Sequence, residues 1–337
     1  MELIVEEFGT FVRKHQGRLR VQKDKQVLQE VPLLHLEQVL IVGGGIGISS
    51  DAIRACCEQG TPIHFLSSLG RAEASLYSAG LTGTVQTRRA QLRAYDDERG
   101  VRLALAFAAG KLHNQANLLR YAGKYRKETA PAVYDELTLL VGEVLDHERA
   151  LAALRGPCVD ELRETILSIE AHAAQRYWAG IKLLVPPALD WPGREGRGAL
   201  DPFNSALNYG YGILAARVER SLVLAGLDPY GGFVHADRPG KASLVFDLIE
   251  EFRQAVVDRT ILGLVTRGVE IEQDEDGRLV EATRRKLAEK LKERMDATEL
   301  YEGKRQPLRI ILQCQARHIA TFLRGDRPDY TPFVAGW

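Results

Sequence analysis

The sequence has few cysteines and lacks any long apolar run. Its 337 residues include four cysteines, no two of which form a CxxC pair: Cys56, Cys57, Cys158 and Cys314. This excludes a disulfide framework and a cysteine-based zinc site. No apolar run approaches the roughly 20 residues that a membrane span needs, and "MELIVEEFGTF" lacks the basic region and apolar stretch of a signal peptide. We expect a reduced, cytoplasmic protein with no membrane partner.

The chain also lacks net charge, which by itself argues against a nucleic-acid partner. The 45 Lys and Arg residues balance 45 Asp and Glu residues. The charges are, however, segregated: residues 81–127 carry ten basic side chains against three acidic ones, residues 128–170 carry three against ten, and residues 301–327 carry six against two. Separated blocks still present a basic surface. The alternative for any single block is a solvated helix face.

What the sequence does contain is enough apolar material, 45% of its residues, for a large core. Up to about residue 80, short runs such as "QVLIV" and "TPIHFL" predict strands, with one helix in "SSDAIRACCEQG". From about Thr87, apolar residues recur every three or four positions, which predicts long helices. We predict an α+β fold, with an N-terminal β-strand-rich domain (1–85) and a larger all-helical C-terminal domain (86–337).

The glycine-rich segment "QVLIVGGGIGISSDAI" resembles the start of a dinucleotide-binding fold. The GxGxxG fingerprint fails in both registers, because Ile48 and Ser50 stand where the third glycine belongs. No alternating strand–helix pattern follows. We therefore expect no nucleotide cofactor and interpret the glycines as a tight turn.

One acidic residue falls on an apolar helix face. In "ETILSIEAHAAQRYW", the residues Ile166, Ala173 and Tyr177 share a stripe, and Glu170 lies within it. A carboxylate on a core face is costly unless it is paired, protonated or bound to a cation. Pairing with a buried arginine and a rotated, half-exposed helix are the alternatives to a cation site.

A second segment, "GGFVHADRPGKASLVFDLIEEFR", adds a histidine and further acids. His235 precedes a Pro-Gly turn, and Asp247 and Glu250 lie one helical turn apart, opposite the main apolar stripe. Phe246 and Val257 flank Glu250, so this helix is predicted to be buried on two sides. A carboxylate-rich set with one imidazole suits Mg²⁺ or Mn²⁺. The alternative for a lone histidine is a core or capping role.

These segments resemble CRISPR-associated protein one, the universal CRISPR spacer-acquisition endonuclease and integrase family. The resemblance covers the whole chain. It is strongest in "SIEAHAAQRYW", "DPFNSALNYGYGIL", "LAGLDPYGGFVHADRPGKASLVFDLIEEFRQAVVDR" and "YEGKRQPLRIILQCQARHIATFLRGDRPDYTPF". It implies a β domain followed by a helical domain, and a homodimer formed largely through the β domains. It also implies DNA strand transfer and hydrolysis in antiviral defence.

The resemblance places the family's catalytic metal ligands on Glu170, His235 and Glu250, with Asp247 as a further acid at or beside the site. Two positions depart from the common pattern: Ala171 replaces a frequent Gly, and Glu250 replaces a frequent Asp. The implied partners are DNA (double-stranded protospacer, CRISPR repeat and branched intermediates) and the small CRISPR-associated protein two.

Basic side chains near the candidate site are expected to neutralise DNA phosphates. They are Arg194, Arg197, Arg238, Lys241, Lys304, Arg305, Arg309 and Arg317. Tyr209 and Tyr211 are candidates to hold a DNA end or stack on a base. Surface ion pairing for the basic residues, and helix packing for the tyrosines, are the alternatives.

Two other functions remain open from the residues alone. One is a non-catalytic DNA-binding scaffold whose buried acids pair with arginines. The other is a structure-specific nuclease that acts on branched DNA in repair through the same residues.

Overall fold

The described N-terminal part of the protein is built from two four-stranded sheets, one α-helix and one short 3-10 helix. The computed structural model describes residues 2–36, 38–70, 72–77, 85–196, 198–236 and 238–337. The sheet orders are β1-β5-β7-β8 and β4-β3-β2-β6. The elements are β1 (Glu2–Val5), β2 (Phe11–His15), β3 (Arg18–Lys23), β4 (Gln26–Pro32), η1 (Leu33–His35), β5 (Gln38–Val42), β6 (Gly47–Ile48), α1 (Ser50–Glu58), β7 (Ile63–Leu66) and β8 (Ala72–Leu76).

Strand β5 is buried along its whole length because it pairs in parallel with β1 and β7 and is covered on both faces. Alternate residues of a strand point to opposite faces. Val39 and Ile41 pack into a core with α1, whereas Leu40 and Val42 pack against Ala216 of the helical part. The apolar run "QVLIV" is therefore a central strand, as its composition predicted.

The remaining elements of the described chain are helices, apart from an antiparallel ribbon of β9 and β10 and an isolated bridge between Gln273 and Leu279. The C-terminal part is therefore mainly helical, and the prediction that it is all-helical is wrong. The mixed architecture agrees with the predicted α+β class. The elements are α2 (Val85–Ala94), α3 (Glu98–Gly123), α4 (Arg126–Thr129), α5 (Pro131–Ala152), α6 (Val159–Leu184), η2 (Pro187–Leu189), α7 (Pro202–Leu224), α8 (Ser243–Ile249), η3 (Gln254–Asp258), α9 (Arg259–Val265), α10 (Glu281–Asp296), β9 (Thr298–Tyr301), β10 (Lys304–Pro307) and α11 (Leu308–Arg324).

The change from strand to helix falls between β8 and α2. It involves residues 78–84, which lie outside the described residues, so the boundary between residues 85 and 86 stays a prediction. No helix in the described ranges has the length and apolar character that crossing a bilayer would require.

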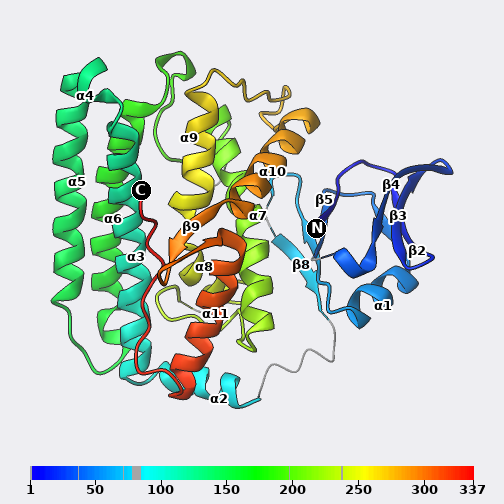
Figure 1. Ribbon diagram of the computed structural model, residues 1–337, viewed down its shortest axis with the longest axis horizontal. Helices are drawn as coiled ribbons and strands as arrows, with labels where there is room; N and C mark the ends of the chain where they lie inside the picture. The colour runs from blue at the N-terminus through cyan, green and yellow to red at the C-terminus, as the bar shows by residue number, and fades with distance from the viewer. Residues whose placement is uncertain (1, 37, 71, 78–84, 197, 237) are drawn as a thin grey trace.

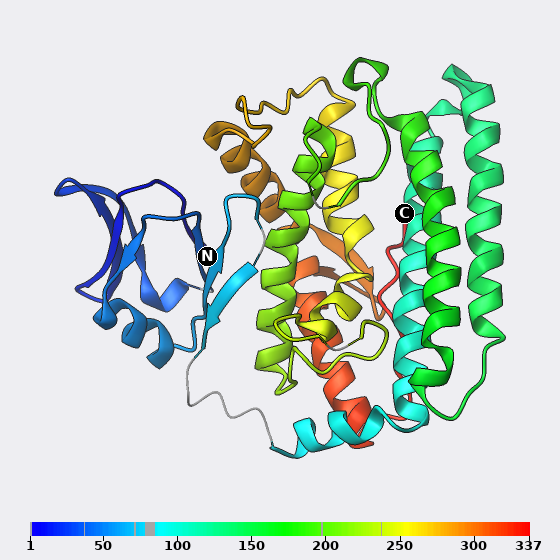
Figure 2. The ribbon, with the colours of Figure 1, turned by 180° about the vertical axis from the view of Figure 1, so that it is seen from behind.

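Helix α7 lies between the strands and the other helices (Figure 1; Figure 2). Arg217 of α7 pairs with Glu2 at 2.7 Å, and Ser75 of β8 donates to Glu219 at 3.3 Å. The closest approach is at Gly212, where an added Cβ would lie 1.5 Å from the carbonyl oxygen of Gly70. Only a residue without a side chain fits there, so glycine at position 212 lets the two parts pack together.

On the other side of the helical part, α3, α5 and α6 run alongside one another, and the C-terminal tail follows α3 (Figure 1). Asn114 of α3 holds this tail, because its side chain donates to the carbonyl of Phe333 and accepts from the backbone N–H of Ala335, both at 2.8 Å. Helix α8 is central and ends facing α3, which brings distant segments of the sequence to one place.

Candidate metal centre

Glu170 lies on the buried face of α6, as its spacing predicted. Ile166, Ala173 and Tyr177 are fully buried, and Glu170 is 5% exposed. The rotated-helix alternative is therefore wrong. A long helix such as α6 fixes the direction of this carboxylate, because each neighbouring turn is packed into the core.

Glu250 is presented by an irregular backbone. Helix α8 ends at Ile249, a turn covers residues 250–252, and the chain resumes as the π-helical segment η3. Such π-helical turns are rare and recur at functional sites. Glu250 is 3% exposed, and its Oε1 pairs with Arg253 at 3.2 Å. The prediction that this segment is buried on two sides is confirmed.

Lys111 of α3 joins the two acids. Its Nζ lies 3.4 Å from Oε1 of Glu170 and 3.3 Å from Oε2 of Glu250. Sequence reasoning did not select this residue. The signal was present, since Lys111 follows the buried Phe107 and Ala108 at helical spacing and precedes the buried Gln115. The test that selected Glu170, a charged residue within an apolar stripe, would also have selected Lys111.

His235 is held by Asp247 at one edge of this cluster. Asp247 Oδ1 lies 2.7 Å from Nδ1 of His235 and also accepts the His235 backbone N–H at 3.0 Å. Its Oδ2 accepts the backbone N–H groups of Phe233 and Val234. With Nδ1–H donating to this carboxylate, Nε2 is the ring nitrogen left to act as a ligand.

Asp247 orients His235, and its predicted role as a possible metal ligand stays a prediction. Both of its oxygens are engaged, by three backbone donors and one imidazole, and the residue is fully buried. It acts as the carboxylate that orients His235.

Burial and the neighbouring charges shift the pKa values of this cluster in opposite directions. Burial raises the pKa of Glu170, and Lys111 opposes this shift without cancelling it. Burial also raises the pKa of Glu250, but Arg253 and Lys111 together outweigh it, so the pKa lies below its usual range. Burial lowers the pKa of Lys111, yet the two carboxylates outweigh burial and the pKa is raised. Lys111 is therefore an ammonium between two acids.

Arg253 packs against a buried hydrogen-bond network of two tyrosines and one aspartate. Tyr211 donates a hydrogen bond to Oδ1 of Asp258, and Tyr177 donates one to Oδ2 at 2.5 Å. Burial raises the pKa of Asp258 to about 6, although these hydrogen bonds oppose the shift. The guanidinium of Arg253 lies 4.9 Å from the centre of the Tyr211 ring. Arg253 is thus fixed between an aromatic face and Glu250.

The donor set suits a hard divalent cation. Across the described part of the chain, no three His, Cys, Asp or Glu side chains are grouped closely enough to hold a metal ion. Glu170, Glu250 and His235 nevertheless offer two buried carboxylates and an imidazole. Oε2 of Glu250 is a buried oxygen that lies 3.3 Å from the Lys111 ammonium. Lys111 supplies the positive charge that these oxygens require.

Comparison with known proteins identifies the family. The family model described as CRISPR associated protein Cas1 matches residues 3–293. The chain belongs to the Cas1 family. Among its relatives, the CRISPR-associated endonuclease Cas1 1 of Archaeoglobus fulgidus is 38% identical over 348 residues, and the alignment covers 100% of both chains.

Solved structures share this Cas1-family fold. A casposase bound to integration product superposes with a TM-score of 0.80 at 22% identity, over 98% of this chain and 92% of that chain. A Cas6-RT-Cas1--Cas2 complex gives a TM-score of 0.77 at 21% identity, over 99% of this chain and 36% of that chain. At these identities the likeness concerns the fold alone.

Two of the residues predicted to contact DNA make contacts within this Cas1-family chain. Tyr209 is 1% exposed and packs beside Gly70, so the helix-packing alternative holds and the predicted DNA contact is wrong. Arg194 donates to Asn204 and Asn208 at 3.1 and 2.7 Å and lies over the Tyr211 ring. Those contacts fix Arg194 onto α7, and its contact with DNA stays a prediction.

The other predicted contacts lie on the surface or outside the described residues. Lys241 is beside the candidate site, because its Nζ lies 5.3 Å from the ring centre of Phe246, which in turn packs against His235. Exposed side chains belong to Arg238, Lys304, Arg305, Arg309 and Arg317. Arg309 donates to Asp296 at 2.9 Å. Arg197 is not among the described residues.

Proposed function

We propose that this chain is a metal-dependent DNA endonuclease and integrase that inserts short foreign DNA segments into a CRISPR array. Membership of the Cas1 family supports the reaction class. The observation that carries the proposal is the pair of buried carboxylates, Glu170 and Glu250, each within 3.4 Å of one cation. Proteins tolerate such a pair where a cation is bound or charge develops.

Glu170, Glu250 and His235 would hold Mg²⁺ or Mn²⁺. When bound, the metal supplies Lewis-acid stabilisation of the charge that develops on a phosphoryl group. Asp247 holds Nδ1 of the imidazole, which leaves Nε2 as the ring nitrogen available to a metal ion. Arg253 holds Glu250 against the Tyr211 ring, which limits the movement of this carboxylate. The chain therefore provides a preorganised set of charges.

The reaction proposed is a transesterification. The 3′-hydroxyl oxygen of the incoming DNA bonds to a phosphorus at the border of the repeat, and the phosphorus–oxygen bond of the array strand breaks. The array strand leaves with a 3′-hydroxyl that gains the proton lost by the attacking group. Water in place of the attacking hydroxyl gives hydrolysis, and the reverse reaction resolves branched DNA.

The proposed partners are DNA, a second copy of the chain and the small CRISPR-associated protein two. Exposed apolar side chains of the strand-rich part support a homodimer there. Phe8, Leu28 and Leu34 are 75%, 44% and 81% exposed. Burying such side chains against a partner would stabilise the dimer by about 25 cal/mol per Å² of apolar area.

A strand-transfer assay tests the proposal. A labelled branched DNA that mimics a half-integrated segment is incubated with the protein in Mn²⁺, Mg²⁺ or EDTA. Glu170→Gln and His235→Ala should lose turnover by at least 100-fold, because each removes a proposed ligand. Their matched controls are Glu164→Gln and His172→Ala, exposed residues on the same helix α6.

Three outcomes separate the candidate functions. Metal-dependent joining at a repeat border, lost in both site variants, supports the integrase. Cutting without preference for a repeat supports the branched-DNA nuclease. Binding without turnover, with the small partner protein present, supports the scaffold and refutes the catalytic assignment.

A further inference from the structure

The short segment 233–235, which carries the proposed ligand His235, belongs to neither a helix nor a strand. Phe233 and Val234 are buried, at 1% and 2% exposure. Backbone groups that are buried outside regular structure have no ladder partners, so side chains must satisfy their hydrogen bonds. In this segment, two side chains of opposite charge share that task.

Asp247 holds the donors of the segment, and Arg163 of α6 holds its acceptors. The Asp247 carboxylate accepts the backbone N–H groups of Phe233, Val234 and His235 at 2.6, 3.2 and 3.0 Å. Arg163 donates from Nε to the carbonyl of Val234 and from a terminal nitrogen to the carbonyl of Phe233, both at 3.2 Å. The backbone that leads to the imidazole is therefore held by two separate elements, α8 and α6.

Arg163 is itself fixed by its neighbours. Its terminal nitrogens donate to the Tyr95 hydroxyl at 2.7 Å and to the carboxylate of Asp160, one turn earlier on α6. The Tyr95 hydroxyl donates to Asp160 at 2.8 Å, and the guanidinium carbon lies 5.5 Å from the centre of the Tyr95 ring. A guanidinium carries five N–H donors in one rigid plane, whereas an ammonium is a single point of charge. Arginine can therefore reach two carbonyl groups, a hydroxyl and a carboxylate at once.

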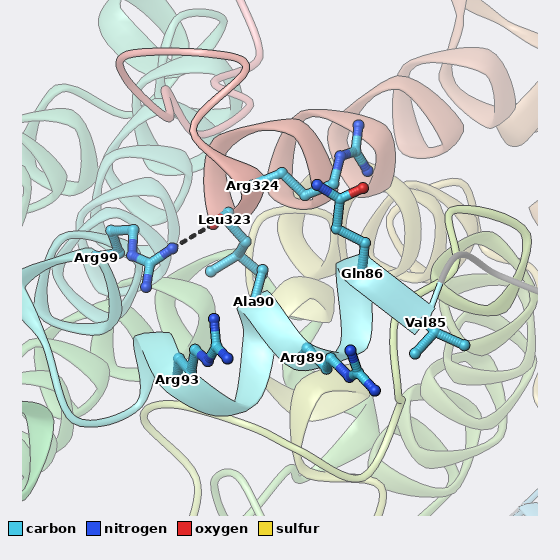
Figure 3. Close-up of a pocket in the computed structure, with 8 residues that line it drawn as sticks. All are labelled: Val85, Gln86, Arg89, Ala90, Arg93, Arg99, Leu323 and Arg324. Carbon is cyan, nitrogen blue, oxygen red and sulfur yellow. Dashed lines mark hydrogen bonds between the residues drawn. The ribbon is translucent and has the colours of Figure 1, made fainter.

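Helix α2 holds the chain just before segment 233–235. Gln91 of α2 donates to the carbonyl groups of Asp228 and Gly231 at 2.8 and 2.7 Å, and accepts the Asp228 N–H at 2.8 Å. Helix α2 also lies alongside the end of α11, across a cleft of about 410 Å³ (Figure 3). The chain thus enters the segment from a fixed position, and Arg163 acts on the last residues before the imidazole.

We propose that Arg163 is a positioning residue that sets where His235 stands relative to Glu170, an inference that rests on the proposed function. Arg163 and Glu170 are seven residues apart on α6, so they lie on one face of the helix, two turns or roughly 10 Å apart. Arg163 therefore ties the histidine segment to the helix that carries Glu170. Asp247 ties the same segment to the part of the chain that carries Glu250.

The position and the charge of Arg163 would affect metal binding in opposite directions. A guanidinium near the site repels a cation, so loss of its charge alone would tighten metal binding. Loss of a group that orients a ligand weakens metal binding by roughly 10- to 100-fold. Because Arg163 contacts the backbone beside His235 and not the imidazole itself, we expect the lower figure. The direction of the change therefore separates a positioning role from a purely electrostatic one.

The test is Mn²⁺ binding, measured from the free ion by electron paramagnetic resonance, which also detects weak sites. Arg163→Met should weaken binding roughly tenfold. In a His235→Ala background the same change should have less than about a twofold effect, because its influence passes through the imidazole. Arg163→Lys keeps the charge and should also bind Mn²⁺ more weakly than the wild type. Arg176→Met, exposed on the same helix and paired with Glu143, is the matched control and should bind Mn²⁺ like the wild type.

Amide hydrogen exchange in EDTA gives a second readout that needs no metal. The N–H groups of segment 233–235 should exchange faster in Arg163→Met, whereas those of α6 around Glu170 should keep their wild-type rates. Urea unfolding checks that each variant is folded, and Arg163→Lys is the milder change if Arg163→Met does not fold.

Three results would overturn the proposal: Mn²⁺ binding that is unchanged or tighter in a folded Arg163 variant, an equal loss in the His235→Ala background, or unchanged exchange of segment 233–235. Each of them leaves the proposed function intact, provided that the wild type binds Mn²⁺ and transfers strands. A wild type that binds no Mn²⁺ would instead refute the proposed metal-dependent function itself.

Discussion

Replacing Lys111 by methionine should show that this ammonium neutralises Glu170 and Glu250 in the absence of metal and competes with a metal ion for them. The change keeps a flexible side chain of similar length and removes the ammonium. Glu170 and Glu250 then remain buried with Arg253 as the nearest compensation. In the absence of metal, the protein should be less stable. In its presence, the carboxylates should bind metal more tightly, since no ammonium competes for them.

The size of the effect follows from the contacts. At 3.3–3.4 Å, each ammonium–carboxylate pair attracts by about 5 kcal/mol at an effective dielectric constant of 20. Desolvation of the three groups offsets much of this, and breaking a buried ion pair costs about 3–5 kcal/mol in practice. The Lys111 side chain is 15% exposed. We therefore expect a loss near the lower limit, about 3 kcal/mol of unfolding free energy.

Urea unfolding in EDTA measures the loss, and calorimetric titration with Mn²⁺ measures the affinity. The affinity of Lys111→Met should rise at least tenfold. Lys124→Met, exposed at the end of the same helix, is the control. A variant as stable as the wild type in EDTA, with unchanged Mn²⁺ affinity, would refute the argument that Lys111 stands in for a metal cation.

Three further predictions concern buried groups. Burial raises the pKa of Glu251 to about 7. The stability that this group contributes is therefore complete below about pH 4.5 and is lost as pH rises through 7. Glu251→Gln should reduce the change in unfolding free energy between those two pH values, measured by urea unfolding, by about 3 kcal/mol. Asp247→Asn should weaken Mn²⁺ binding by about 10- to 100-fold, since it disturbs the orientation of His235; unchanged affinity would contradict that role. Gly212→Ala should lower the melting temperature, because its Cβ would meet the carbonyl of Gly70, whereas an unchanged melting temperature would show that the two parts separate easily.

The amino-acid sequence by itself determined the class of fold and indicated a buried acid, Glu170, as a candidate ligand. The periodicity of α6 placed Glu170 on a buried face, and β5 was recognisable from its uninterrupted apolar run. These features are local, because helix and strand periods depend only on neighbouring residues. The assignment of His235 and Glu250 as ligands came from resemblance, and it remains a prediction.

The tertiary structure decided which charges meet. Lys111 is far from Glu170 and from Glu250 in the sequence, and only the packing of α3 against α6 and η3 brings the three together. Asp247 and Glu250 share one short segment, yet Asp247 is hydrogen-bonded to His235, whereas Glu250 faces the ammonium of Lys111. Contacts between segments distant in sequence depend on how the helices pack, and the pattern within one segment does not specify that packing.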